Sequence, residues 1–466
     1  MSSRKPPTYQ SPPKQIRKKA PPPRKAPKRS SSIRWMWMLF GLTGVAMLSA
    51  TAGALLAVSL SATPLMQRQL TAEEAEVFTE EESISTKMNL RLPELTRPVN
   101  ILILGTKVLT SDLDTAPQQD LGYHALVNSF DGLSDTMMLV RFDPSRQALA
   151  LLSIPRDTRA YIENVGTSKI NAANSYGGPA LAARATSELL GGVGVDRYVR
   201  INVQGVEKLI DALGGVTLYV PQDMKYQDDS QHLYINLKAG KQHLNGKEAL
   251  QFLRFRYDNY GDIGRVQRQQ TFIRALKEQA LNPTTIARLP KILSVIQENL
   301  DTNLTVEELV ALVGFASRTE RSNVEMLMVP GRFSAADEYE ASYWIPDPSR
   351  IDTMMAQHFG LGYSEVAATP PAYLRVAIQD STGDYDAPQS VIDVLGNAGF
   401  GDVYVDTPRQ EPLQVTRIVA QQGDVESAEA VRQVLGLGEV RVESTGELRS
   451  DVTVQLGQDW IRRYGN

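Results

Sequence analysis

Residues 251–270 read QFLRFRYDNYGDIGRVQRQQ, and four arginines fall within fifteen positions of this stretch. These arginines are Arg254, Arg256, Arg265 and Arg268. From Gly264 onward the apolar residues recur at helical spacing, which predicts a helix. On such a helix Arg265, Arg268 and Gln269 stand at i, i+3 and i+4, so they share one face.

The residues ahead of this helix add to the charge pattern. Asp262 stands where an N-cap residue is expected. If residues 254–257 are extended, Arg254 and Arg256 project to the same side. Guanidinium groups that converge near a helix N-terminus would bind a multiply charged phosphate group. The simpler alternative is a solvated, charged helix. The single sign of the projecting charges and the Gln pair at 269–270 favour the anion site.

Composition excludes several other classes of site. The chain has 466 residues and no cysteine, so disulfides, Cys-ligated zinc and thiol catalysis are excluded. The four histidines do not form an HExxH pattern, and the GxSxG, GxxxxGK[ST] and GxGxxG patterns are absent. The usual nucleophile and nucleotide signatures are therefore missing.

The first sixty residues indicate a membrane anchor. Residues 1–34 hold eleven Lys and Arg, eight Pro and no acid, which predicts a disordered tail. Residues 35–60 are uncharged and long enough to cross a bilayer, with Trp35 and Trp37 at the basic end. A cleaved signal peptide is the alternative. The positive-inside rule places the tail in the cytoplasm and the bulk of the chain outside, in a single-pass arrangement in the plasma membrane.

The rest of the chain divides by composition. Residues 61–97 are acid-rich and predict a stalk, residues 98–358 a main domain, and residues 359–372 a linker. Residues 373–458 predict a small α/β module, and residues 459–466 a tail. The module shows no cluster of catalytic side chains, so a chain that ends near residue 368 is expected to retain the activity of the main domain.

Strands and helices alternate along the main domain. Strands are expected at 100–105, 136–142, 148–154, 197–201, 216–220 and 324–329. Helices are expected at 179–190 and 203–213, after Asn245, and near 265–281, 284–299 and 305–317. This alternation predicts an α/β domain with helices on both faces of a sheet.

Several short motifs occur together in this domain. They are GLSDT at 132–136, SIPRDT at 153–158, KIN at 169–171, DALGG at 211–215 and DIGRVQRQQ at 262–270. In this order, behind a basic tail and one apolar span, they resemble the LytR–CpsA–Psr family of cell-envelope proteins over residues 98–332. Residues 373–458 resemble the LytR C-terminal module. The resemblance implies a three-layer α/β/α sandwich with a hydrophobic cleft for a lipid tail.

The resemblance also implies a reaction and its partners. Proteins of this family are phosphotransferases on the outer side of the plasma membrane. They move a glycopolymer with one phosphate from a polyprenyl-diphosphate carrier to a hydroxyl of peptidoglycan or another envelope polysaccharide. Transfer of a phosphoryl group depends on positioned cations and donors.

Site residues follow from matching positions. Asp135 corresponds to a metal-ligand carboxylate, and Asp262 to an acid near the reaction centre that would act as a base. The resemblance assigns charge stabilisation or diphosphate binding to Arg156, Arg254, Arg256, Arg265 and Arg268. Gln269 corresponds to a polar group beside the phosphates. Plainer roles exist: Asp135 could cap a turn, and Arg156 could pair with Asp157. Lys169 and Asn171 are left out of the site.

One position departs from the family pattern. Lys107 stands where the family usually carries an aspartate that helps to hold the metal. An ammonium cannot bind a divalent cation, so Lys107 is expected to contact the diphosphate. The alternative is that Asp112 or Asp114 replaces the missing ligand. We therefore expect Mg²⁺ or Mn²⁺ to be weakly held.

Two other functions use the same features. One is a membrane-anchored regulator or polymer-binding scaffold whose tail contacts nucleic acid. The tail has no folded recognition helix and no aromatic platform for bases, so no nucleic acid is expected. The other is hydrolysis of a polyprenyl diphosphate, in which water replaces the sugar hydroxyl.

Overall fold

The computed structural model describes residues 70–78, 83–87, 92–107, 129–229, 233–255, 261–280, 288–335, 337–362, 369–447 and 449–464. All of them belong to one compact unit, Ser59–Asn466. The expected span at 35–60 and the residues Arg256, Asp112 and Asp114 lie outside these ranges. Within the ranges, no helix has both the length and the hydropathy needed to cross a bilayer.

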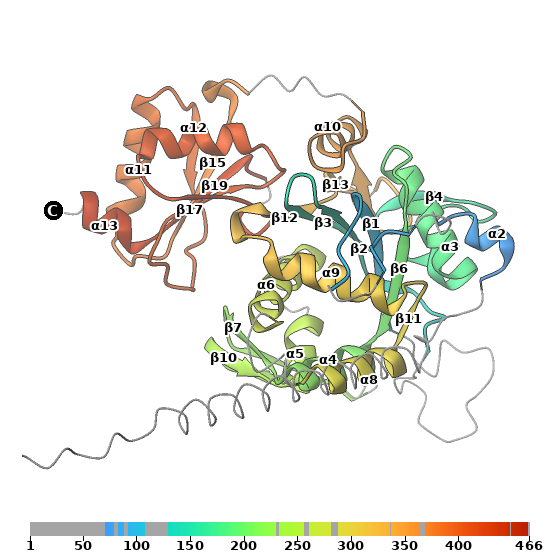
Figure 1. Cartoon of the computed structure of the whole chain (residues 1–466). Helices are drawn as coiled ribbons and strands as arrows, with labels where there is room; N and C mark the ends of the chain where they lie inside the picture. The colour runs from blue at the N-terminus through green and yellow to red at the C-terminus, as the bar shows by residue number, and fades with distance from the viewer. Residues whose placement is uncertain are drawn as a thin grey trace, which may run out of the picture. The chain divides into compact units, whose positions relative to one another are not determined.

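A six-stranded mixed sheet forms the centre of the main domain (Figure 1). In spatial order its strands are β11 (Leu300–Thr302), β6 (Arg197–Asn202), β1 (Val99–Thr106), β2 (Ser134–Asp143), β3 (Ala148–Ile154) and β12 (Val324–Met328). β1 pairs antiparallel with β2 and parallel with β6, and β3 pairs parallel with β12. The predicted strands of this sheet are confirmed to within two residues at each end, and only the short β11 was not predicted.

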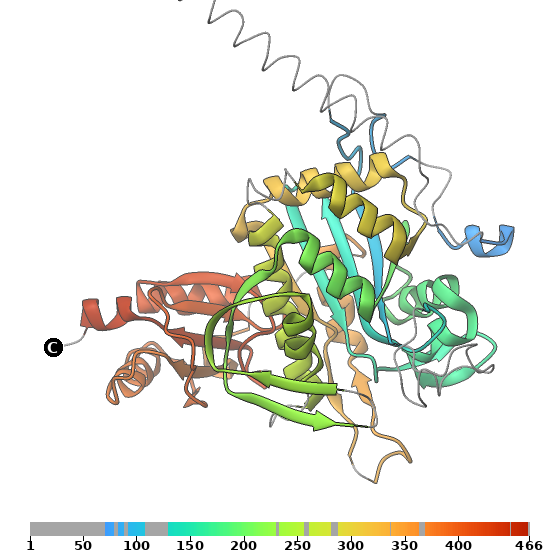
Figure 2. The same cartoon turned by 90° about the horizontal axis from the view of Figure 1, so that it is seen from below.

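Alternation of side chains along β1 produces the two faces of this sheet. Leu102 and Leu104 pack in one core with α3 (Ala172–Leu189) and α10 (Pro348–Phe359). Ile101, on the opposite face, packs against α9 (Val306–Arg318). Ile273 of α6 (Gly261–Ala280) covers the same face over β2. Figure 2 shows α9 and α3 on opposite sides of the sheet, which confirms the three layers.

Smaller elements complete the domain. Two further helices are α4 (Val203–Leu213) and α8 (Leu289–Asn299), and η2 (Arg321–Asn323) is a single 3₁₀ turn. The two-stranded sheets are β4 (Arg159–Ile162) with β5 (Gly166–Lys169), β7 (Val216–Val220) with β10 (Gly240–Leu244), β8 (Met224–Asp228) with β9 (Leu233–Leu237), and β13 (Gly331–Phe333) with β14 (Trp344–Pro346). Of the strands in these two-stranded sheets, only β7 was predicted.

Local features explain how two helices compare with their predicted starts, since one begins earlier than predicted and the other begins as predicted. α3 begins at Ala172, but Gly177 and Gly178 interrupt it with non-helical backbone, and Pro179 opens its second part. The predicted start at residue 179 is therefore the restart of the helix. α5 (Gly246–Arg254) begins as predicted, because Asn245 and Glu248 form a capping box.

The expected stalk at 61–97 needs a correction. After the short helix α2 (Ala72–Ala75), Phe78 is 3% exposed, and its ring centroid lies 5.2 Å from that of Tyr198. Ile84 is fully buried, in a core shared with Val99. Aromatic and aliphatic side chains within this acid-rich stretch bury against the sheet, so these residues are part of the domain.

The C-terminal module is a second α/β layer structure. Its sheet has the order β16 (Asp402–Val405), β15 (Arg375–Asp380), β19 (Val452–Leu456), β17 (Arg417–Ala420) and β18 (Glu439–Val442). Its helices are η3 (Pro371–Tyr373), α11 (Ala387–Asn397), α12 (Val425–Leu435) and α13 (Gln458–Tyr464). β19 was not predicted. The expected tail at 459–466 is largely α13, and its Trp460 is 1% exposed.

Candidate functional site

The start of β2 brings a carboxylate and a hydroxyl beside the end of β1. Thr136 pairs with Gly105 across the two strands, and the register shifts at the next residue, so that Thr106 faces Ser134. A Cβ on Gly105 would lie 2.9 Å from the Cβ of Thr136, so only glycine fits there. Asp135, between Ser134 and Thr136, is therefore held at the irregular end of this strand pair.

Arg156 lies beside Asp135. Its Nη1 is 2.8 Å from Asp135 Oδ1, and both side chains are about four-fifths buried. On its other side, Arg156 Nε is 3.4 Å from Asp157 Oδ2. Asp157 Oδ1 is in turn 2.8 Å from Lys169 Nζ on β5. These four side chains form a row, here called the charged row, in the order Asp135, Arg156, Asp157 and Lys169. Charge alternates along it: the guanidinium lies between the two carboxylates, and the ammonium stands at the end.

Two asparagines hold the loop that leads into Asp135. The Nδ2 group of Asn174 donates to the carbonyl oxygens of Phe130 and Gly132, at 2.9 and 2.7 Å. The carbonyl oxygen of Asn171 accepts from the backbone N–H of Ser134 at 3.2 Å. The KIN motif, which was left out of the site, thus supports it through Lys169 and Asn171. The sequence held one indication of this role, because the KIN motif at 169–171 stands between the site motifs at 153–158 and 262–270.

Helix α6 adds an amide and two guanidinium groups. Gln269 Nε2 donates to Thr136 Oγ1 at 2.8 Å, which places the helix against the residue that follows Asp135. Arg265 and Arg268 are each 6% exposed. Arg268 Nη2 donates to the carbonyl oxygen of Phe255, and its guanidinium lies 5.8 Å from the centre of that ring. The hydroxyl of Thr136 was not predicted as a partner.

Two expectations change at the start of this helix. α6 begins at Gly261, so Asp262 lies in its first turn and is not an N-cap residue. Arg254 is the last residue of α5 and is not extended. It directly precedes Phe255, so Arg268 reaches the end of the helix that carries Arg254. The structure does not describe the side chain of Asp262, and Arg256 lies outside the described residues.

Lys107 directly follows β1 and is half-buried. Since Gly105 pairs with Thr136, the backbone register places Lys107 at the same end of the β1–β2 pair as Asp135. The structure thus brings Asp135 and Arg156 into contact and sets Gln269 against Thr136, the next residue, with Lys107 at the adjoining strand end. Arg268 precedes Gln269 on α6, and its contacts are with Phe255. An arrangement of cations and amide donors around one carboxylate is suited to bind phosphate oxygens.

The donor set limits which metal ion this site suits. Among the described residues, no group of three or more His, Cys, Asp or Glu side chains is arranged to hold a metal ion. Asp135 supplies one carboxylate, which Arg156 already contacts. Magnesium often binds to one or two carboxylates, with water and substrate phosphates as its other ligands. Asp135 fits such an ion when a phosphate shares it.

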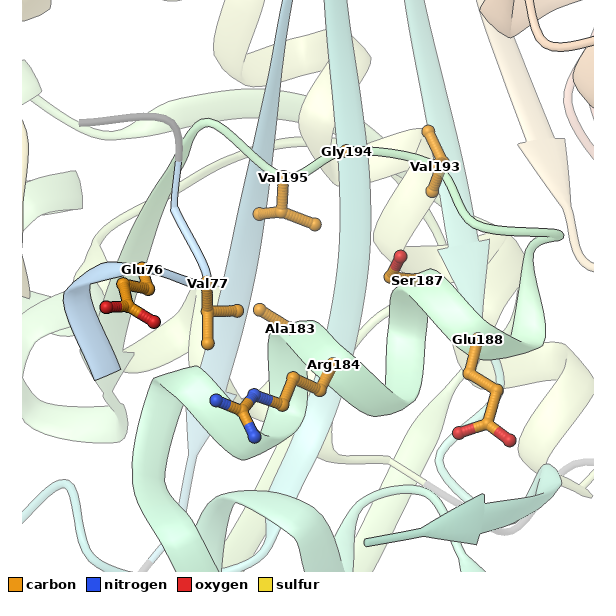
Figure 3. A pocket seen from close by; sticks show the side chains of 9 residues that line it. All are labelled: Glu76, Val77, Ala183, Arg184, Ser187, Glu188, Val193, Gly194 and Val195. Carbon is orange, nitrogen blue, oxygen red and sulfur yellow. The ribbon is translucent and has the colours of Figure 1, made fainter. Parts of the chain in front are cut away.

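A pocket of about 420 Å³ lies elsewhere in the domain (Figure 3). It opens between α3, residues 76–77 and residues 193–195, and Arg184 and Glu188 of α3 border it. No side chain of the charged row lines it. We therefore place the candidate site at the charged row and α6.

Family comparison agrees with these motifs. The LytR_cpsA_psr family model matches residues 63–359. The chain belongs to the LytR–CpsA–Psr family. A second match, described as LytR cell envelope-related transcriptional attenuator, covers residues 373–460. The family match begins well before residue 98, consistent with the packing of Phe78 and Ile84 into the domain.

Relatives within the family are named for different functions. The chain is 32% identical over 228 residues to polyisoprenyl-teichoic acid–peptidoglycan teichoic acid transferase TagV of Bacillus subtilis (strain 168). The matched region covers 47% of this chain and 58% of TagV. The chain is also 35% identical over 207 residues to regulatory protein MsrR of Staphylococcus aureus (strain COL). The matched region covers 44% of this chain and 61% of MsrR. The chain thus spans about three-fifths of the length of these relatives.

A solved structure of TagV from B. subtilis also matches. It is 28% identical in sequence, and the match covers 57% of this chain and 99% of that chain with a TM-score of 0.47.

Proposed function

We propose that this protein is a membrane-anchored phosphotransferase of the cell envelope. In this proposal it moves a glycopolymer phosphate from a polyprenyl-diphosphate carrier to a hydroxyl of peptidoglycan. The observation that carries the proposal is the contact of Asp135 with Arg156 next to the contact of Thr136 with Gln269. Together these contacts place a guanidinium, a carboxylate and an amide at one end of β2. Membership of the family and the transferase activity named for TagV support it.

In the proposed reaction, the acceptor hydroxyl oxygen attacks the phosphorus that bears the glycopolymer. A new P–O bond forms, the P–O bond to the bridging oxygen breaks, and polyprenyl phosphate leaves with the bond's electron pair. The acceptor proton passes to a base, which we assign to Asp262 in the first turn of α6.

The other residues stabilise charge. Arg156, Arg265 and Arg268 would neutralise charge on the phosphate oxygens, and Gln269 would orient one of them. Arg254, Arg256 and Lys107 would bind the rest of the diphosphate. A weakly held Mg²⁺ or Mn²⁺ beside Asp135 would supply additional positive charge.

Turnover with a defined donor tests the proposal. The full chain, in detergent micelles, would be incubated with a polyprenyl-diphosphate-linked saccharide, with and without a peptidoglycan glycan acceptor. We expect a saccharide–phosphate–glycan product that forms only with acceptor present. Release of free saccharide phosphate at the same rate without acceptor would instead identify a hydrolase. No turnover of the donor in either case would contradict the proposal and favour a regulator or scaffold.

The proposed location requires one crossing of the plasma membrane by residues 35–60. The uncharged span and its basic flank support this topology. Protease added to intact spheroplasts should digest the domains after residue 60 and spare an epitope placed in residues 1–34. Protection of the domains in intact spheroplasts, with digestion only after lysis, would contradict the exported location.

A further inference from the structure

A hairpin close to the charged row carries exposed aromatic rings. β13 and β14 pair at its base, and residues 334–343 connect them. Phe333 is 48% exposed, and its ring meets that of Trp344 edge-on at 5.2 Å between centroids. Tyr339 and Tyr343, both part-exposed, meet in the same way at 5.4 Å. An exposed aromatic surface rimmed by polar residues marks an interaction site.

Hydrogen bonds connect the described residues on the two sides of this hairpin. Arg332 donates through Nη1 and Nη2 to the two carboxylate oxygens of Glu338, each at 2.8 Å. The backbone N–H of Ser334 donates to the carbonyl of Tyr343 at 2.9 Å, and Tyr343 N–H donates to Ser334 Oγ at 3.0 Å. A surface that is already ordered loses little conformational entropy when it binds a ligand.

The hairpin adjoins the candidate site through its backbone. Trp344 N–H donates to the carbonyl oxygen of Asp157 at 2.9 Å, and Trp344 forms a parallel bridge with Thr158. Lys169 Nζ, which is 2.8 Å from Asp157 Oδ1, lies 5.9 Å from the ring centre of Tyr343. The aromatic rings therefore begin where the charged row ends.

Strand β4 extends the same surface. The guanidinium of Arg159 lies 4.9 Å from the ring centre of Tyr339. Arg159 and Tyr161 are the two exposed residues of β4, and they project to the same side because side chains alternate along a strand. Tyr161 is 51% exposed. The aromatic hairpin surface therefore consists of Tyr339 and Tyr343 of the hairpin with Tyr161 of β4. Phe333 packs on Trp344 instead and is not part of this surface.

The chemistry of this surface favours a sugar over a lipid or a protein core. Pyranose rings pack their C–H faces on aromatic rings, while their hydroxyls need polar partners close by. The exposed acids Asp337 and Glu340 flank Tyr339 in the sequence, so this surface offers both aromatic rings and polar partners. The same acids oppose insertion among anionic lipid head groups.

We propose that the aromatic hairpin surface binds pyranose rings of the acceptor glycan beside the phosphate site. This inference rests on the proposed transferase function. The acceptor glycan would lie on the hairpin side of the site. The phosphate would lie at Arg156, and the sugar chain would continue over Lys169 toward the hairpin.

Saccharide binding can be measured without turnover. The full chain in detergent would be titrated with a soluble tetramer of β-1,4-linked N-acetylglucosamine, followed by calorimetry. Tyr339→Ala and Tyr161→Ala should each weaken binding about tenfold, as the loss of one stacked ring predicts. Tyr339→Phe keeps the ring and should retain binding. Tyr385→Ala is the matched control, since Tyr385 is 96% exposed and lies in the C-terminal module.

Kinetics then separate the acceptor from the donor. In the transfer assay, the hairpin variants should raise KM for the glycan acceptor about tenfold, with kcat and the donor KM changed less than about twofold. Unchanged saccharide binding in Tyr339→Ala and Tyr161→Ala, or a rise confined to the donor KM, overturns the inference. If no turnover occurs but saccharide binding still depends on Tyr339, the saccharide site stands and the transferase proposal fails.

Discussion

Arg156 is the residue whose replacement tests the site most directly. Its side chain is 21% exposed and lies between two carboxylates, so removal should leave the surrounding core intact. Arg265 is less suitable, because at 6% exposed its loss also removes packing. Arg156→Ala should reduce the transfer rate by about 10²- to 10³-fold, as the loss of one charge-stabilising donor does.

A matched control exists for this variant. Arg184 also contacts a carboxylate at 2.8 Å, that of Glu163, but on the exposed surface of α3. Arg184→Ala should leave the transfer rate within about twofold, because a surface ion pair contributes little. Equal rates for the two variants would show that the diphosphate site has been misplaced.

Lys107 should determine how strongly activity depends on magnesium. If the ammonium neutralises phosphate charge, Asp135 and the substrate hold the ion alone, and the rate should vary only shallowly with Mg²⁺ concentration. Lys107→Asp should shift half-activation to lower Mg²⁺. A steep dependence in the unchanged protein, abolished by Asp112→Asn or Asp114→Asn, would assign the second ligand to those carboxylates instead.

Sequence identified charged site residues better than their neutral partners. Asp135 and Arg156 stand in short motifs, and the structure places them in contact. The hydroxyl of Thr136 was missed, because its partner Gln269 lies 133 positions away and no local pattern links them. Lys169 was left out of the site because its contact with Asp157 depends on the turn of β4 into β5.

At the scale of elements, α5 and α6 show where local patterns mislead. The alternating residues around Arg254 suggested an extended segment, but the capping box at Asn245 starts a helix that continues through Arg254. α6 begins at Gly261, four residues before its expected start at 265, so Asp262 lies in the first turn. An acid there still interacts favourably with the helix dipole, which explains why the sequence resembled a cap.

The aromatic hairpin should respond to acid through Glu338. Its contacts with Arg332 lower the pKa of this carboxyl from 4.5 to about 2. A lowered folded-state pKa contributes stability above the unfolded-state value, and this stability is lost as the pH falls from about 4.5 toward 2. Tyrosine fluorescence or side-chain NMR shifts of Tyr339 should change in this window.

Glu338→Gln provides the comparison, since it keeps the shape of the side chain and removes the charge. In this variant the signal of Tyr339 should no longer titrate between pH 4.5 and 2. Because Glu338 is part-exposed and its partner Arg332 is exposed, the readout is the local conformation of the hairpin, and the global melting temperature should change little. Titration that persists in Glu338→Gln would assign the transition to another acid.

At the scale of the whole molecule, hydrophobic alternation predicted most of the sheet strands but missed β19. This strand is central in the C-terminal sheet and fully buried, yet Thr453 and Gln455 interrupt its apolar run. Both polar side chains make hydrogen bonds inside the module: Thr453 Oγ1 accepts from Gln421 at 2.8 Å, and Gln455 donates to Gln379 at 3.2 Å. Buried hydrogen bonds of this kind cannot be read from periodicity.

The C-terminal module contacts the helix that carries the site arginines. Ser444 N–H donates to Gln270 Oε1 at 3.1 Å, and Gln267 Nε2 donates to the carbonyl of Gly446 at 2.8 Å. Arg274 Nη2 is 2.6 Å from a carboxylate oxygen of Glu443. These three contacts act on α6 near Arg268 and Gln269. The expectation that the main domain keeps its activity without the module therefore has a structural alternative, in which the module holds α6 in position.

Glu443→Gln distinguishes a main domain that is active without the module from one that needs the module to position α6. Burial lowers the pKa of Arg274 and Glu443 raises it, so the variant leaves a buried guanidinium without its counter-charge. Loss of one partner of a buried pair costs about 3 kcal/mol. If the module positions α6, amide exchange in α6 should quicken and the transfer rate should fall. Glu439→Gln, which breaks the more exposed pair with Arg441, should do neither. Unchanged α6 exchange and rate in Glu443→Gln, with full activity after truncation at residue 368, would show that the main domain needs no support from the module.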